Sequence, residues 1–137
     1  MVRKFIIDDN YRKEISEYTV WDKTTVDTSL INHARNVDRI VTDIYKLKKE
    51  LTIAKKEYKL LYNKKYYYYT YDSDEVADTE TEKKHMIEKD EEIIEITSIV
   101  SDIENDIEFL TNFKDALRDK GFNIKNFIDW QNFLAGK

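Results

Sequence analysis

The residues best suited to chemistry lie in one segment, Lys55–Tyr71, which reads KKEYKLLYNKKYYYYTY. Ammonium groups neutralise phosphates and release counterions, and phenol rings offer faces on which any base can stack. Lysines interleaved with tyrosines are therefore typical of a surface that binds single-stranded nucleic acid. Copies of the segment in an oligomer would strengthen such a surface, since weak contacts multiply by avidity.

A second interpretation of the same segment stays open at this point. Residues 66–69 are four consecutive tyrosines, so on a helix they point in all directions and some must face a packing partner. Lysine clusters on long helices often serve only to keep the protein in solution. The segment by itself therefore fits packing and solvation as well as nucleic-acid binding.

Other chemistries find little support in the sequence. The two histidines, His33 and His85, are far apart and have no helix-spaced partners of the kind that bind metal ions. The chain contains no cysteine, no glycine-rich phosphate loop and no nucleophile motif. We therefore expect no enzyme activity, no metal site and no cofactor.

Charge is distributed unevenly along the chain, although the net charge is only −5. Residues 46–65 contain eight lysines and two acids, whereas residues 72–108 contain fifteen acids and three lysines. The basic block is a candidate electrostatic footprint for a polyanion. The acidic stretch 72–92 is interpreted as solvated; its alternative roles are to contact basic partner surfaces or to screen the basic block until a strand displaces it.

The elements that position these residues must be helices, because the chain has no proline and only two glycines. A short helix is expected at Asp9–Tyr18, followed by an extended stretch through Trp21. A helix of about forty residues is expected from Val26 to Tyr71, since apolar residues recur there every three or four positions. Its length of about 60 Å requires a helical partner.

A second long helix is expected to begin between Thr81 and Glu88 and to end at Gly121, with a short aromatic helix after it. Its apolar stripe and the aromatic tail are predicted to mediate assembly of several chains. The predicted oligomerisation residues are Ile93, Ile96, Val100, Ile103, Ile107, Leu110, Leu117, Phe127, Trp130 and Phe133.

Together these elements predict an all-α fold: a long helical hairpin or coiled coil with short helices at the N- and C-termini. We expect residues 1–71 to hold the short helix and the basic helix, with the DNA-binding segment at about 46–71. Residues 72–84 would form a mobile acidic connection, and 85–137 the oligomerisation region. Acids arrive early in the chain and no long apolar run follows, so an intracellular, soluble protein is expected.

The C-terminal sequence resembles a known family. Residues 114–125, KDALRDKGFNIK, and the final residues 133–137, FLAGK, resemble the close of the UvsY-type recombination mediators of tailed bacteriophages. The segment that begins LKKEL at Leu47 and ends in tyrosines occupies the place of that family's basic, DNA-associated region. It departs from the family pattern in using only lysine, with Asn63 where a basic residue is expected.

The resemblance implies a protein that loads a RecA-like phage recombinase onto single-stranded DNA occupied by a single-strand-binding protein. It also implies a homo-oligomeric ring of six or seven subunits in the cytoplasm of the infected bacterium. Carried over to matching positions, DNA contact falls first on Lys64 and Lys65, and the tyrosine run would supply stacking faces. The full set of predicted DNA-binding residues is Lys55, Lys56, Lys59, Lys64, Lys65, Tyr66, Tyr67, Tyr68 and Tyr69.

Two rival functions belong to a different class. A helical-hairpin chaperone of the prefoldin kind also pairs two long helices, and a structural coiled-coil scaffold needs no nucleic acid at all. Neither gives a reason to place eight lysines beside a run of tyrosines. Salt-sensitive binding of a single strand would argue against both.

Overall fold

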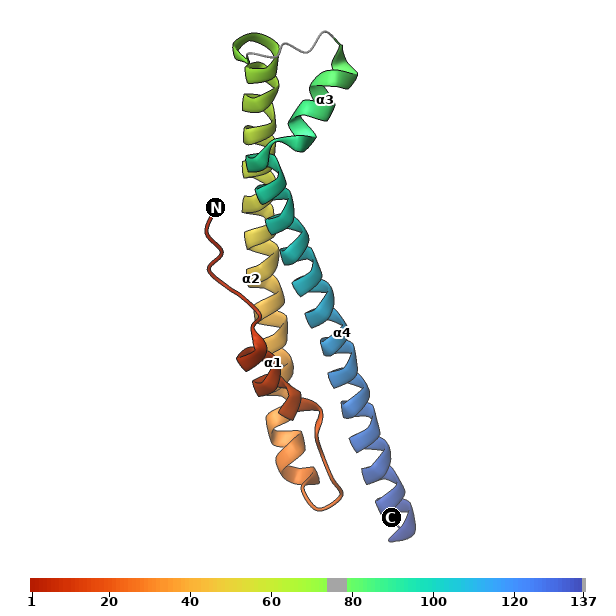
Figure 1. Ribbon diagram of the computed structural model, residues 1–137. Coiled ribbons are helices and arrows are strands. Elements are labelled where there is room, and N and C mark those ends of the chain that lie inside the picture. Colours follow the sequence, from red (N-terminus) through yellow and green to blue (C-terminus); the bar gives the residue numbers. More distant parts are fainter. Residues whose placement is uncertain (74–78, 137) are drawn as a thin grey trace. The chain divides into compact units, whose positions relative to one another are not determined.

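The computed structural model describes residues 1–73 and 79–136, and within these ranges the only regular elements are helical (Figure 1). The all-α prediction is therefore confirmed. The elements are α1 (Asp9–Ser16), the 3-10 turn η1 (Glu17–Thr19), α2 (Val26–Tyr67), the π-helical turn η2 (Tyr68–Asp72), α3 (Glu80–Lys89) and α4 (Glu91–Leu134).

The chain divides into two compact units, and the long helices α2 and α4 each contribute to both. We call Met1–Lys4 with Leu47–Asn105 the basic unit, after the lysine block of α2, although acids outnumber bases in it by fifteen to twelve, and Phe5–Lys46 with Asp106–Lys137 the anchor unit. The basic unit contains most of the lysine block, the tyrosine run, α3 and the start of α4.

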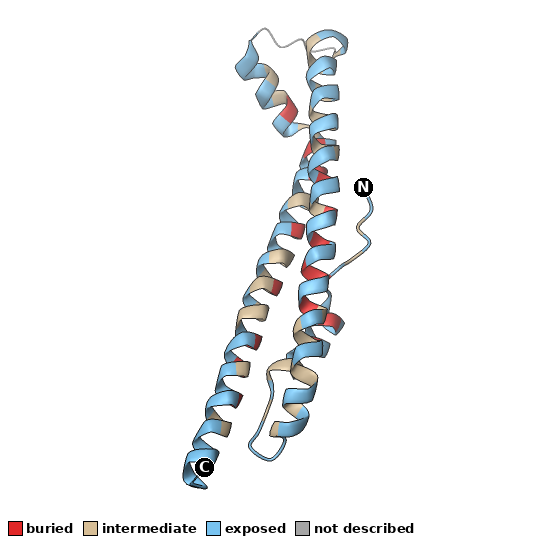
Figure 2. Ribbon diagram, turned by 180° about the vertical axis from the view of Figure 1, so that it is seen from behind, coloured by how far each residue is buried: buried red, intermediate tan, exposed pale blue. Residues whose placement is uncertain are grey.

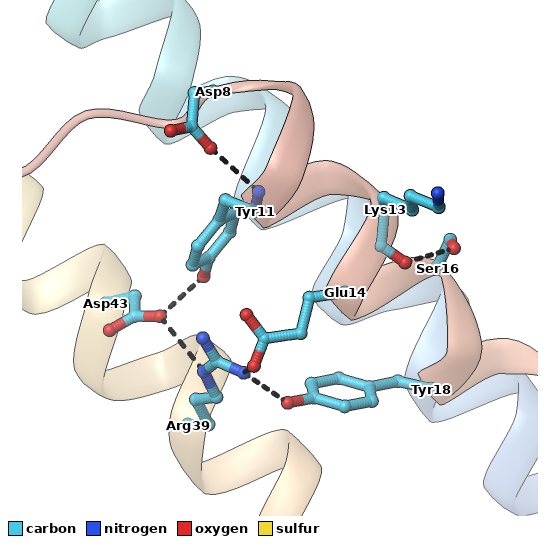
Figure 3. Close-up of polar contacts among 8 residues, drawn as sticks. All are labelled: Asp8, Tyr11, Lys13, Glu14, Ser16, Tyr18, Arg39 and Asp43. Atoms are coloured by element: carbon cyan, nitrogen blue, oxygen red, sulfur yellow. Dashed lines mark hydrogen bonds and ion pairs between the residues drawn. The ribbon is translucent and has the colours of Figure 1, made fainter.

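In the anchor unit, polar contacts attach α1 to α2 (Figure 3). Asp8 caps α1 by accepting a hydrogen bond from the backbone N–H of Tyr11 at 2.8 Å. The Tyr11 hydroxyl donates to the buried carboxylate of Asp43, and Arg39 lies 3.8 Å from that carboxylate while donating to Glu14. Burial, followed by the hydrogen bond to Asp43, raises the pKa of Tyr11 well above its ordinary value.

The same unit also joins its N-terminal segment to α4. The ammonium group of Lys120, which is buried, donates a hydrogen bond to the backbone carbonyl of Tyr18. The guanidinium of Arg12 lies 4.6 Å from the centre of the Phe109 ring, a cation–π distance. These two contacts attach the N-terminal segment to α4 beside the apolar core.

Gly121 does not end a helix, so the prediction of a separate C-terminal helix is wrong. Helix α4 continues through Gly121 to Leu134, and Ile124, which extends its apolar stripe, is fully buried. A Cβ atom at Gly121 would lie 2.9 Å from Nε2 of His33 on α2. The glycine therefore serves a close approach of two helices, whereas the left-handed backbone that terminates a helix occurs at Gly136, with φ 76°.

The predicted boundaries near the N-terminus need smaller corrections. The helices that begin at Asp9 and at Val26 are confirmed. Tyr18, predicted as the end of the first helix, lies instead in the 3-10 turn η1, and the extended backbone begins after that turn, at Val20. Before α2, the carboxylate of Asp22 accepts hydrogen bonds from the backbone N–H groups of Thr24, at 2.7 Å, and Thr25, at 3.0 Å. This Asx-type turn starts the helix.

In the basic unit, the portion of α2 after Leu47 lies beside the first turns of α4, and both bury apolar side chains (Figure 2). Part of the stretch predicted as a connection is helical, because Asp72 ends η2 and residues 80–84 belong to α3; residues 74–78 lie outside the described residues. Asp90 interrupts the helix between α3 and α4. Its backbone is extended and its side chain accepts from the N–H of Glu92 at 3.0 Å, which caps α4.

The apolar stripe of α4 is largely covered within the single chain. Five of the predicted oligomerisation residues are at most 5% exposed, which leaves them no surface for a second chain. These are Ile93, Ile96, Ile103, Leu110 and Leu117. They form the core of the two units because α2 already supplies the partner helix, so the assignment of these five to oligomerisation is corrected. Trp130 and Phe133, 56% and 71% exposed, stay open.

Candidate nucleic-acid interface

The lysines of the basic segment differ in how free they are. Lys55, Lys56, Lys59 and Lys64 project from α2 into solvent. Only Lys55 among these four has an ion pair within the described residues, a long one of 3.8 Å to the exposed Glu104. Exposed pairs of this kind contribute little to stability, so all four ammonium groups are available to a phosphate at small cost.

Lys65 is held by acids of the same chain. Its ammonium group lies 3.2 Å from Asp90 and 3.1 Å from Glu92, and its side chain is only 16% exposed. Burial opposes the charged form, but the hydrogen bonds to Glu92 and Asp90 outweigh it, so the pKa of Lys65 is raised. A strand that used Lys65 would have to replace both carboxylates.

Two tyrosines of the run are held by acids in the same way. The Tyr69 hydroxyl donates to Asp90 at 2.7 Å, and this hydrogen bond, with burial second, raises the pKa of Tyr69 to about 12. The Tyr66 hydroxyl donates to Glu80 at 2.9 Å. Lys83, which pairs with Glu80 at 3.2 Å, also lies 5.2 Å from the centre of the Tyr66 ring. Acids of α3 and of the α3–α4 junction thus engage the tyrosine run.

The other two tyrosines of the run are open. Tyr67 is 60% exposed and Tyr68 is 43% exposed. The Tyr67 ring lies 4.9 Å from that of Tyr71, the next tyrosine after the run, and Lys65 lies 5.8 Å from the Tyr68 ring. Tyr66 and Tyr69 therefore make contacts within the chain, whereas Tyr67 and Tyr68 present their rings, and stacking on bases stays a prediction for these two.

Sequence reasoning did not single out two further tyrosines, Tyr58 and Tyr62. Both are half-buried on α2, with ring centres 6.0 Å apart, and Tyr58 lines a cavity together with Lys55 and Lys59. Their spacing of four residues, which places both on one side of α2, is the signal in the sequence that could have identified them.

Within residues 1–73 and 79–136, no group of three histidine, aspartate or glutamate side chains is placed to hold a metal ion. His33 and His85 lie on α2 and α3, in different units. Among the helices described, none is both long and apolar enough to cross a membrane.

Fold and surface together describe an all-α protein whose open lysines and tyrosines suit a single-stranded polyanion. Residues 14–137 match the family described as "Recombination, repair and ssDNA binding protein UvsY". The chain belongs to this UvsY family, as its C-terminal sequence indicated. A comparison with curated proteins found no significant sequence match.

Solved structures of one relative have the same fold. A crystal structure of the bacteriophage T4 recombination mediator protein UvsY (lattice type II) has a TM-score of 0.83 at 19% identity, covering 96% of this chain and 99% of that one. The lattice type IV structure has a TM-score of 0.80 at 18% identity, covering 91% and 96%. At these identities the comparison establishes the fold alone.

Proposed function

We propose that this protein is a non-enzymatic recombination mediator that helps load a RecA-like phage recombinase onto single-stranded DNA covered by single-strand-binding protein. Membership of the UvsY family supports the role in recombination and strand binding. The observation that supports strand binding by α2 is a group of exposed lysines next to exposed tyrosine rings. These lysines are Lys55, Lys56, Lys59 and Lys64.

The physical role of this surface follows from mass action. Each lysine that neutralises a phosphate releases counterions, and each tyrosine that stacks on a base contributes about 1–3 kcal/mol. Contacts of this kind compete with those of a single-strand-binding protein on the same strand. A strand held partly by the mediator is exposed over short stretches, on which a recombinase can nucleate.

Assembly into a homo-oligomeric ring of six or seven chains is part of the proposal. The end of α4 supports it, because Trp130 and Phe133 stack with ring centres 5.6 Å apart yet stay exposed in the single chain. Large aromatic side chains of this kind are enriched at protein interfaces. A ring would repeat the lysine surface once per subunit and raise the effective affinity for one long strand.

The mediator function is tested by recombinase assembly on oligothymidine precoated with a single-strand-binding protein. We expect this protein to shorten the lag before recombinase filaments form, and to do so less in a variant with Lys55, Lys56, Lys59 and Lys64 changed to glutamine. An unchanged lag with the unaltered protein would contradict the loading function. If the lag is unchanged but the protein still binds the strand, it is a strand-binding protein without mediator activity.

Oligomerisation is tested separately by sedimentation velocity of a Trp130→Ser, Phe133→Ser variant. Both side chains are exposed in the single chain, so the fold should survive while the oligomer becomes smaller. The matched control is Phe122→Ser, since Phe122 is 57% exposed on the same helix but outside the terminal pair. An unaltered sedimentation profile of the double variant would show that the pair does not hold subunits together.

A further inference from the structure

Two adjoining cavities lie along the open face of the basic unit. The first, of about 360 Å³, is lined by Lys55, Tyr58, Lys59, Thr97 and Val100. The second, of about 270 Å³, has Tyr58 and Lys59 in common with the first. Because they share these two residues, we treat the cavities as one surface and call it the Tyr58 groove.

The lining of the groove combines apolar, aromatic and basic groups. Beyond the shared residues, the second cavity is lined by Tyr62, Asn63, Lys84, Glu88 and Ile93. Three lysines and one glutamate therefore surround walls made of two phenol rings and aliphatic side chains. The amide of Asn63 can both donate and accept hydrogen bonds, as the edge of any base requires. This is the chemistry of a nucleotide: a flat ring with an anion beside it.

The volumes of the two cavities favour a single base over a partner helix as the occupant. Small-molecule sites occupy about 300–1,000 Å³, so one cavity lies just above the lower end of that range and the other just below it. That space holds a flat ring of the size of one base, whereas a partner helix about 10 Å wide would need a longer and wider channel. An acidic peptide would satisfy the lysines but would leave the faces of the tyrosine rings without a stacking partner.

The groove is also more available than most of the tyrosine run. Lys59 and Lys84 are exposed and have no ion pair in the described part of the chain, whereas Lys65 is bound to Asp90 and Glu92. The hydroxyl groups of Tyr66 and Tyr69 donate to carboxylates of the chain itself. A strand entering the groove displaces fewer existing contacts than one that follows the run.

We propose that the Tyr58 groove takes successive bases of a single strand, with Tyr58 and Tyr62 as stacking faces and Lys55, Lys59 and Lys84 as phosphate contacts. This inference rests on the proposed strand-binding function and names its path. The two ring centres are 6.0 Å apart. Bases that follow both rings are therefore spaced more widely than the rise of about 3.4 Å in stacked DNA. A strand bound to both rings is therefore held in a stretched conformation.

The test is fluorescence anisotropy of labelled oligothymidine with a Tyr58→Leu, Tyr62→Leu variant. Leucine preserves apolar packing but removes the stacking face, so we expect affinity to fall roughly tenfold or more. The Tyr58→Phe, Tyr62→Phe variant keeps the rings and should bind within about threefold of the unaltered protein. The control is Tyr45→Leu, on the same helix but in the anchor unit and 59% exposed.

The outcomes separate this inference from the proposed function. If the unaltered protein binds the strand, the leucine variant binds equally well, and a Tyr67→Leu, Tyr68→Leu variant loses affinity, the groove is not the path although strand binding stands. If the unaltered protein does not bind at all, the proposed function itself fails. Equal loss in the phenylalanine and leucine variants would contradict stacking.

Two further measurements guard against a variant that merely misfolds. Lys59→Gln changes one exposed residue, and should lower the slope of log affinity against log salt by about 0.7, as loss of one single-strand phosphate contact requires. An oligonucleotide carrying 5-iodouracil should cross-link to Tyr58 or Tyr62 in the unaltered protein. Cross-links confined to other residues, or a labelled polyglutamate peptide that binds the groove and is not displaced by oligothymidine, would overturn the proposal.

Discussion

The two units differ in how many of their lysine, arginine and tyrosine side chains are held by contacts within the chain. In the anchor unit, Arg39 donates to Tyr18 and Tyr11 donates to a buried carboxylate (Figure 3). Lys120 donates to a backbone carbonyl of the same unit. In the basic unit, most lysines of α2 face solvent, and Tyr67 and Tyr68 are exposed. Some cations and phenol rings of the anchor unit therefore stabilise the fold, whereas most lysines of α2 and two tyrosines of the run remain open to a ligand in the basic unit.

Because of this difference, we expect residues of the anchor unit to determine stability and residues of the basic unit to determine strand binding. A buried polar group that loses its partner costs the full desolvation penalty, whereas an exposed lysine costs almost nothing to change. Substitutions in the anchor unit should therefore reduce the free energy of unfolding. Substitutions on the open face of the basic unit should reduce strand affinity and leave the fold intact.

The largest effect is expected from Asp43→Ala in the anchor unit. This change removes the acceptor for the Tyr11 hydroxyl and a neighbour of Arg39, leaving a buried hydroxyl unpaired. We expect the free energy of unfolding to fall by about 2–3 kcal/mol, measured by urea denaturation followed by circular dichroism. Asp38→Ala, at an exposed position of the same helix, is the control. An equal loss in both variants would remove the distinction between the buried and the exposed carboxylate.

The next effect is expected from Lys59→Gln, Lys64→Gln in the basic unit. Both side chains are exposed, so stability should change by less than about 0.5 kcal/mol. Strand affinity should fall and the slope of log affinity against log salt should decrease by about 1.4, the value for two single-strand phosphate contacts. Lys13→Gln, an exposed lysine of α1, should leave the slope unchanged. A slope that does not respond to the double change would show that these lysines do not meet phosphates.

A smaller effect is expected from Asp90→Asn, which tests the acids that hold the tyrosine run. Asparagine keeps the N-cap of α4 but removes the charge that Lys65 and Tyr69 contact. The pKa of Tyr69, about 12, should move towards its ordinary value of about 10, followed by tyrosinate absorbance. Strand affinity should rise, since Lys65 then gains freedom to contact a phosphate. Lower affinity would mean that Asp90 helps to build the site instead of restraining it.

The smallest effect concerns pH and His33 in the anchor unit. Burial, with the nearby ammonium of Lys120 second, lowers the pKa of His33 below its ordinary value of about 6.5. Between that value and the lower folded value the unfolded chain binds more protons, so the free energy of unfolding decreases as pH falls below about 6.5. Burial also lowers the pKa of Lys120, the ammonium group next to His33.

Urea midpoints at pH 7.5 and pH 5.5 check this prediction. The unaltered protein should lose more stability between the two than His33→Gln does. His85→Gln, at an exposed histidine of α3, should behave like the unaltered protein. The same loss in all three proteins would assign the pH dependence to the carboxylates alone.

Much of the fold follows from local rules that act within a single helix. The three-and-four spacing of apolar residues placed α2 within a few residues, and the absence of proline explains why it runs uninterrupted from Val26 to Tyr67. The role of Gly121 could not be predicted in this way. A glycine is needed there because His33, 88 positions away in the sequence, lies too close for a Cβ atom. A glycine that ends a helix can be recognised from neighbouring residues, but a close approach of two helices cannot.

The candidate site was predictable in composition but not in its partners. Lysine and tyrosine counts identified the segment, and Lys59 and Lys64 are open as expected. Sequence reasoning could not tell that Asp90 would engage both Lys65 and Tyr69, because that contact depends on the break between α3 and α4. The same limit concealed Tyr58, whose cavity exists only when α2 and α4 lie side by side.

The central claim is that the open lysines and tyrosines of the basic unit bind a single strand. Its most direct test is fluorescence anisotropy of labelled oligothymidine, titrated with the unaltered protein at low and moderate salt beside a duplex of equal length. We predict tight binding that favours the single strand and weakens steeply as salt rises. Absence of binding at low salt, or equal affinity for the duplex, would contradict the account and leave these residues as packing and solvation on a helical scaffold.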